Sequence, residues 1–177
     1  MANDNLPDFI SALLQTKQDG CSTDPQLVQT HISFVLLVGE FVYKFKKPVN
    51  FGFLDFSTLE KRQHYCEQEL LFNRRLCPDI YLDIVTVTRK DDIYTLNGSG
   101  EVIEYAVKMV RMPEEKMMVN LIQADKLNRV HIDTLVDKLI PFYQQADRTS
   151  EIDKYGTAES VAVNVVENFE QTQGFIN

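Results

Sequence analysis

The chain has 177 residues, of which 44% are hydrophobic, and a formal net charge of −8 at pH 7. This length is enough for one domain with a hydrophobic core, or for one lobe with a helical extension. The acidic balance argues against a general binder of nucleic acid or of membrane surfaces, because such proteins carry a basic patch. A local lysine or arginine could still bind phosphate.

The N-terminal residues and the cysteines predict a soluble cytoplasmic protein. The first residues include acidic side chains where a signal peptide has basic ones, and no stretch is long and apolar enough to span a bilayer. Cys21, Cys66 and Cys77 are odd in number and form no C-x-x-C motif, which predicts free thiols in a reducing compartment. His64 lies near Cys66, but a second pair of zinc ligands is missing.

The first part of the chain changes from helical to strand-like patterning. Apolar residues at helical spacing predict a helix over 6–17, ended by Asp19-Gly20. Two runs rich in β-branched and aromatic residues then flank Gly39-Glu40, which predicts a hairpin turn. The predicted strands cover residues 27–32, 34–38 and 41–46.

A long helix and further strands follow. Ser57 and Thr58 are both candidate N-caps, and Glu60 has the spacing of a capping box with Ser57, which predicts a helix over 57–76 that ends before Pro78. The next strand-like segments are YLDIVTVTRK, IYTLNG and EVIEYAVKMVRM, with turns at Asp91-Asp92 and at GSG. Helical patterns return within residues 113–125, 131–146 and 157–169, with Pro141 expected to kink the second of these helices or to lower its stability.

This order of elements predicts an α+β fold. We expect an antiparallel sheet of about five strands, with one long helix inserted after the third strand, followed by helices. We expect the chain to divide into a sheet-containing part at 1–113 and a helical part at 114–177.

The strand at 41–46 contains two lysines that could carry chemistry. Alternation places Lys44 and Lys46 on one face, and the aromatic residues between and beside them on the other. A buried ammonium group is costly unless it is paired. Glu67 and Glu69 of the following helix are two residues apart, so only one of them can face the sheet. A lysine paired with one of these glutamates could bind the phosphates of a nucleotide.

Structural explanations compete with this hypothesis. A single lysine on an edge strand often extends its ammonium group into solvent, and a helical glutamate is often solvated. We favour Lys44 for the buried role and keep Lys46 as the alternative. For Lys46 and Lys47 together, the more common explanation is an exposed basic end of a hairpin.

Three segments taken together resemble a known family. They are THISFVLLVGEFVYKFKKPVNFGFLDFSTLEKR, CEQELLFNRRLCPDIYL and EYAVKMVRMP. They resemble the N-terminal lobe of the protein-kinase-like fold and, more narrowly, the bacterial aminoglycoside phosphotransferase-like family. The similar branch consists of uncharacterised proteins, some of which are fused to a P-loop ATPase-like domain. The resemblance implies ATP with Mg²⁺ as cofactor and a small-molecule hydroxyl group as acceptor in the complete protein.

The resemblance also assigns roles to individual residues. It implies that Lys44 anchors phosphate and that Glu69 pairs with it. It implies that the strand ending at Met109 leads into a hinge at 110–113, where adenine would hydrogen-bond to the backbone. The hinge residues concerned are Arg111 and Met112.

The resemblance also implies a role for the turn before the second predicted strand. The turn at 30–33, which includes Ser33, takes the place of the loop that covers the phosphates. The glycine-rich pattern G-x-G-x-x-G is missing there, so only backbone N–H groups and hydroxyls are offered.

The catalytic block of the family is not matched. Kinase-like transfer uses H-x-D-x-x-x-x-N and a later metal-binding aspartate. The H-x-D at 131–133 is followed by Lys138 where asparagine is required, and Asp133 opens an amphipathic helix, where a negative charge is favourable. We predict a false match, with no catalytic or metal-binding residue in this chain.

Two functions are therefore expected. In the first, the chain is the nucleotide-binding lobe of a phosphotransferase that ends before the catalytic loop, inactive by itself, with a C-terminal lobe or a P-loop ATPase-like domain as partner. In the second, it is a non-catalytic interaction module that keeps the shape of the lobe.

Overall fold

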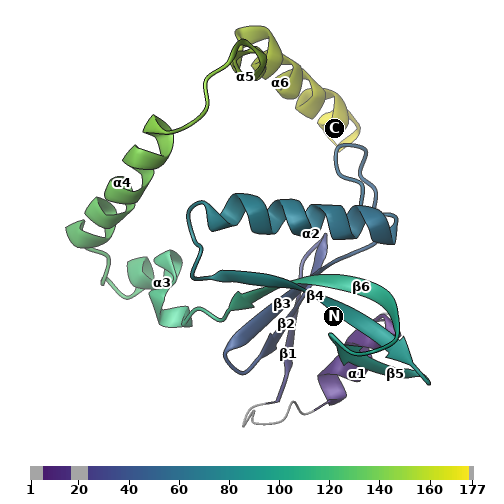
Figure 1. Ribbon diagram of the computed structural model, residues 1–177. Helices are drawn as coiled ribbons and strands as arrows, with labels where there is room; N and C mark the ends of the chain where they lie inside the picture. Colours follow the sequence, from purple (N-terminus) through teal and green to yellow (C-terminus); the bar gives the residue numbers. More distant parts are fainter. Residues whose placement is uncertain (1–5, 17–23, 176–177) are drawn as a thin grey trace. The chain divides into compact units, whose positions relative to one another are not determined.

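The computed structural model describes residues 6–16 and 24–175 (Figure 1). The expected turn at Asp19-Gly20 and the thiol of Cys21 lie outside the described residues. The chain forms two compact units, the first ending at Leu127 and the second beginning at Asn128. The division falls later than the expected 113/114 boundary, because the 3₁₀ turn η1 (Glu114–Lys116) and helix α3 (Met118–Gln123) belong to the first unit.

The first unit contains a six-stranded antiparallel sheet, so the α+β class is confirmed and the expected strand count of about five is one too low. The spatial order of the strands is β1-β2-β3-β6-β4-β5. Their bounds are Gln26–Gln29 for β1, Ser33–Val38 for β2, Phe41–Lys46 for β3, Tyr81–Lys90 for β4, Ile93–Leu96 for β5 and Glu101–Val110 for β6. Strand β3 therefore pairs with β6, although they are far apart in the sequence.

Two tight turns form where the sequence predicts them. Gly39 joins β2 to β3 with a φ angle of 55°, in the left-handed region that glycine adopts at little cost. Asp91 and Asp92 join β4 to β5 with φ angles of 50° and 60°. Positive φ at both central residues is typical of the two-residue turns that match the twist of a hairpin.

The long helix α2 (Leu59–Arg74) follows β3, as expected, and Thr58, one of the two candidate caps, is its N-cap. The Thr58 hydroxyl oxygen accepts a hydrogen bond from Lys61 N at 3.3 Å. Ser57, the other candidate and the first residue of the expected capping box, is not the cap, because it donates to Asp55 Oδ1 from both its amide and its hydroxyl group. This local turn keeps Ser57 outside the helix.

Replacing Thr58 by alanine is expected to lower the free energy of unfolding by about 1 kcal/mol, because one N–H group of the first helical turn loses its partner. Chemical denaturation followed by circular dichroism measures this change. Thr58→Ser keeps the hydroxyl group and is expected to match the wild type. An unchanged midpoint for Thr58→Ala would show that the cap does not stabilise α2.

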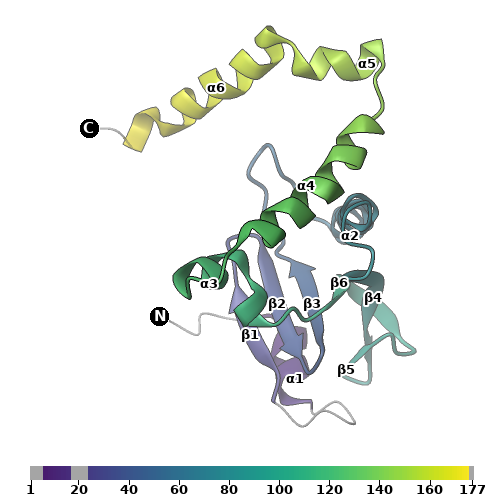
Figure 2. The same cartoon turned by 90° about the vertical axis from the view of Figure 1, so that its left-hand side faces the viewer.

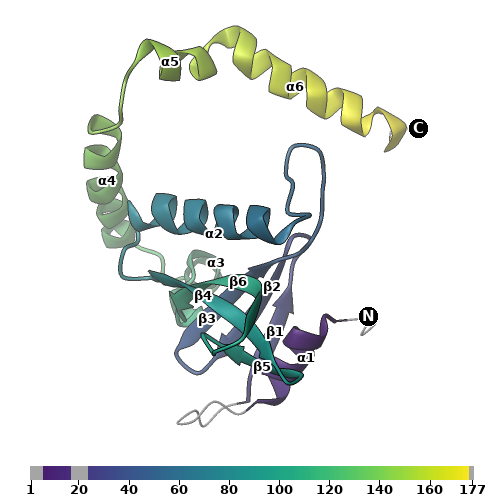
Figure 3. The same ribbon diagram turned by 45° about the vertical axis from the view of Figure 1, so that its right-hand side comes forward.

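Helices α1 (Asp8–Gln15) and α2 cover opposite faces of the sheet (Figure 3). Figure 2 views α2 almost along its axis, beside β6. Ile10 and Leu13 of α1 are buried against a set of inward-facing strand residues. That set is Phe34, Leu36, Val38, Tyr43, Phe45, Val85, Val87 and Ala106. The lysines of β3 alternate with Tyr43 and Phe45, so they face α2.

The second unit is helical, as expected. It contains α4 (Arg129–Gln144), α5 (Ser150–Asp153), η2 (Lys154–Gly156), α6 (Ala158–Thr172) and η3 (Gln173–Phe175). Helix α4 continues through Pro141. No helix in the described ranges combines the length and the apolar character needed to cross a membrane.

Candidate functional site

Two lysines of β3 share one glutamate of α2. Lys44 Nζ lies 2.8 Å from Glu69 Oε1, and Lys46 Nζ lies 2.7 Å from Glu69 Oε2. Glu69 comes three residues after Cys66, which is fully buried against the sheet, so both lie on the same face of α2. The expected ion pair between Lys44 and Glu69 therefore forms, and Lys46 joins it rather than replacing Lys44.

The two lysines differ in burial. The side chain of Lys44 is 31% exposed and that of Lys46 is 6% exposed, while Glu69 is 13% exposed. The expectation of an exposed basic hairpin end is therefore wrong for Lys46, and the buried role expected for Lys44 belongs to Lys46. Phe56 encloses Lys46, whose Nζ lies 4.9 Å from the centre of the aromatic ring. A cation over an aromatic face is attracted by the negative face of the ring.

The shared carboxylate is ionised but does not balance both cations. Burial raises the pKa of Glu69, but the hydrogen bonds from Lys44 and Lys46 outweigh it and hold the pKa below its ordinary value. Two ammonium groups then face one carboxylate, so the cluster has one positive charge in excess. In a chain with a net charge of −8, this local excess favours an anionic ligand.

A second buried ion pair, which the sequence analysis missed, lies between α2 and β6. Arg62 Nε lies 2.9 and 2.8 Å from the two carboxylate oxygens of Glu104, and Arg62 also donates to the Phe56 carbonyl at 3.1 Å. Burial raises the pKa of Glu104 despite these hydrogen bonds. The i, i+4, i+7 spacing of Arg62, Cys66 and Glu69 marks one helical face and could have revealed Arg62. This pair is balanced and adds no net charge.

Beside Lys44, the same face of the sheet is apolar and partly exposed. Val35 pairs across the strands with Lys44, and Val42 pairs with Met109. Directly paired residues of an antiparallel sheet project to the same face. On β1, β2 and β3 the apolar residues of this face are Val28, Val35, Leu37 and Val42, and together with Met109 of β6 we call them the apolar sheet face. The expected site residue Met109 thus lies one row of cross-strand pairs from Lys44.

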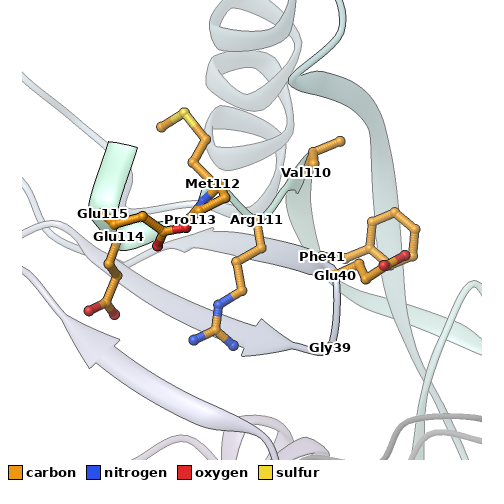
Figure 4. Close-up of a pocket in the computed structure, with 9 residues that line it drawn as sticks. All are labelled: Gly39, Glu40, Phe41, Val110, Arg111, Met112, Pro113, Glu114 and Glu115. Carbon is orange, nitrogen blue, oxygen red and sulfur yellow. The ribbon is translucent and has the colours of Figure 1, made fainter. Parts of the chain in front are cut away.

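A pocket of about 660 Å³ lies where the β2–β3 turn meets the segment after β6 (Figure 4). It is lined by residues 39–41 and 110–115, which include the expected hinge. Arg111 and Met112 point in opposite directions (Figure 4), and the Arg111 guanidinium donates to Gln26 Oε1 at 3.4 Å. The pocket thus combines apolar groups with both signs of charge.

Two backbone N–H groups of the hinge are hydrogen-bonded within the chain. The Arg111 amide donates to the Glu40 carbonyl at 2.8 Å, and the Val110 amide donates to the Ile80 carbonyl at 2.9 Å. These two N–H groups have partners within the chain, so the expected contact of adenine with the hinge backbone stays a prediction that involves the other backbone groups of residues 110–113. Met112, the other expected hinge residue, is 51% exposed.

The loop before β2 is folded tightly on itself. Thr30 N donates to the Ser33 carbonyl at 2.9 Å, and Ile32 N lies 3.3 Å from the Thr30 hydroxyl oxygen. Ser33 is 1% exposed and pairs across the strands with Lys46. The buried position of Ser33 does not suit the expected contact with phosphate.

The H-x-D sequence is part of a capped helix. At the start of α4, the side-chain oxygen of Asn128 accepts from Val130 N at 3.0 Å, and His131 Nδ1 accepts from Asn128 N at 3.2 Å. Asp133 accepts from Arg129 Nε at 3.3 Å. These contacts stabilise the helix, so the segment is not a loop that presents Asp133 to a substrate. In the described ranges, no three His, Cys, Asp or Glu side chains are grouped to hold a metal ion.

Mycobacteria contain proteins of similar sequence. The chain is 31% identical over 140 residues to uncharacterised proteins of Mycobacterium bovis (strain ATCC BAA-935 / AF2122/97) and of Mycobacterium tuberculosis strains H37Rv and CDC 1551. The match covers 79% of this chain but only 26% of each relative, so the chain spans about a quarter of their length. No family model and no solved structure matches the chain.

Proposed function

We propose that the first unit is the nucleotide-binding lobe of an ATP-dependent small-molecule phosphotransferase of the aminoglycoside phosphotransferase or kinase-like class. The observation that carries this proposal is the excess positive charge at Lys44, Lys46 and Glu69, next to the apolar sheet face. A nucleotide needs both surfaces, because its base is largely apolar and its phosphates are anionic.

The geometry supports one orientation of the nucleotide. The base would lie against Val35, Leu37 and Val42, with its edge toward the hinge pocket. The phosphates would then extend along β3 toward Lys44, whose side chain is 31% exposed. The residues of this chain fit the nucleotide better than its metal ion, because no three His, Cys, Asp or Glu side chains in the described ranges are grouped to hold a metal ion. Residues beyond this chain would complete the metal site.

The remaining parts of the activity also lie beyond the first unit. We propose that a longer protein supplies the catalytic aspartate, the acceptor pocket and the metal-binding residues, and that it works in the cytoplasm. The relatives are about four times as long as the matched region, which leaves room for such a lobe or for a P-loop ATPase-like domain.

Lys44→Met is expected to weaken ATP binding at least tenfold, since hydrogen bonds to charged groups contribute about 1.5–3 kcal/mol. Isothermal titration calorimetry, with ATP titrated into the protein in the presence of Mg²⁺, measures this loss of affinity. The matched control is Lys108→Met, which removes the same charge from the opposite face of the sheet, where Lys108 lies over the Phe41 ring. Equal losses of ATP affinity in both variants would show that the effect comes from the net charge of the chain and not from a contact of Lys44. A wild type that binds no ATP would contradict the proposal.

The second unit favours a second candidate, a non-catalytic interaction module. Its helices expose many large apolar side chains that could dock another domain. On α4 and α6 these are Val130, Ile132, Leu135, Val136, Leu139, Ile140, Tyr143, Val161, Val163, Val165, Val166 and Phe169. Absence of ATP binding in a protein as long as the mycobacterial relatives would favour this candidate; tight binding that depends on Lys44 would exclude it.

A further inference from the structure

We propose that the two lysines have separate tasks: Lys46 is the permanent partner of Glu69, and Lys44 is the lysine that leaves Glu69 to bind the anionic ligand. Lys46 is then a positioning residue that never touches the ligand. This inference rests on the proposed function and refines it, because it assigns the phosphate contact to one of two lysines that bind the same carboxylate.

Burial fixes Lys46 in place. Its side chain is 6% exposed and is enclosed by Phe56, itself 3% exposed, and by the carboxylate of Glu69. Moving Glu69 away would leave a buried ammonium group without an anion, which is strongly destabilising. Lys44 is about five times as exposed as Lys46 (31% against 6%), so its ammonium group can exchange Glu69 for water or for a ligand anion.

The carboxylate of Glu69 is also arranged for this exchange. Its two oxygens bind one lysine each, at 2.8 and 2.7 Å. When Lys44 leaves, the bond between Oε2 and Lys46 remains, and Glu69 keeps a cationic partner. If Lys44 were the sole partner, its departure would leave a carboxylate that is 13% exposed without a counter-charge. Lys46 therefore allows Lys44 to leave Glu69 and bind the ligand anion.

An indirect effect follows for variants of Lys46. In Lys46→Met, Glu69 has Lys44 as its remaining lysine partner, and the two form a balanced pair that a ligand anion must break. Anion binding then weakens although the lost side chain makes no contact with the anion. Removing the charge of Glu69 in the same chain, by Glu69→Gln, frees Lys44 again. A lysine that bound the anion directly could not be replaced in this way.

The binding experiment uses inorganic tripolyphosphate as the probe, titrated into the full chain in a calorimeter. We expect Lys46→Met to weaken binding about tenfold, as for the loss of one charge-assisted interaction, and Lys46→Met/Glu69→Gln to return to within about threefold of the wild type. Lys44→Met/Glu69→Gln is expected to stay at least tenfold weaker. If the Lys46→Met/Glu69→Gln chain stays as weak as Lys46→Met, Lys46 contacts the anion and the inference is overturned.

A second measurement needs no ligand. Glu69→Gln is expected to lower the denaturation midpoint, because it leaves Lys46 buried with a neutral partner. Adding Lys46→Met is expected to restore most of the midpoint, whereas adding Lys44→Met is not. Equal restoration by both would show that the two lysines are equivalent and would overturn the division of tasks. A wild type that binds no tripolyphosphate would overturn the proposed function and the release of Lys44, while the midpoints would still decide which lysine Glu69 holds.

Discussion

Replacing Glu104 by alanine is expected to lower the free energy of unfolding by about 3–5 kcal/mol, the range for removing one partner of a buried ion pair. Arg62 would remain between α2 and β6, 9% exposed, without the carboxylate that now binds its Nε at 2.8 and 2.9 Å. Urea denaturation at neutral pH measures the loss. An unchanged slope of the unfolding free energy against urea concentration would show that the unfolded state is unaffected.

The control is the double substitution Arg62→Met/Glu104→Leu. Burial raises the pKa of Glu104, so the ionised carboxylate is less favourable in the folded chain than in the unfolded chain, and it lowers stability at neutral pH. Apolar side chains of similar volume remove both charges together, and we expect most of the lost stability to return. A double variant as unstable as Glu104→Ala would show that the pair itself stabilises the fold.

Local features of the sequence were sufficient to predict the hairpins and α2. The turns at Gly39 and at Asp91-Asp92 depend on backbone angles that few residues adopt, so the residue types identify them. The sequence left the helix cap open between Ser57 and Thr58, because both side chains carry a hydroxyl group. The choice between them depends on Asp55, which binds Ser57.

The site itself was only partly predictable. Alternation along β3 and the family resemblance together identified Lys44 and Glu69. The burial of Lys46 depends on Phe56, which approaches it only after the chain has turned toward α2. Arg62 and Glu104 are 42 residues apart, on α2 and on β6, and they meet because α2 packs against β6. Such contacts follow from the topology of the sheet rather than from any single segment.

The hydrogen bonds of the hinge at 110–113 could also be predicted only in part. Pro113 cannot continue a strand ladder, which predicts that β6 runs to Met112, but the strand ends two residues earlier, at Val110. The sequence does not indicate that the Glu40 carbonyl, in the turn between β2 and β3, accepts a hydrogen bond from the Arg111 amide at 2.8 Å. An internal partner of this kind removes a backbone donor from the set that a ligand can use.

Replacing Phe45 by alanine is expected to lower the free energy of unfolding by about 3–5 kcal/mol, because it opens a cavity between α1 and the sheet. Phe45 is fully buried, and its ring centre lies 5.5 Å from that of Phe9 in α1. Thermal and urea denaturation measure the loss. Phe45→Leu keeps most of the volume and is expected to cost clearly less.

The same variants test whether the two faces of β3 act independently. Phe45 points toward α1, while its neighbours Lys44 and Lys46 reach Glu69 on the other face. If the chain binds ATP as proposed above, we expect Phe45→Leu to bind ATP with the affinity of the wild type while losing stability, the reverse of Lys44→Met. A parallel loss of binding in Phe45→Leu would contradict this separation, because packing against α1 would then control the position of the lysines.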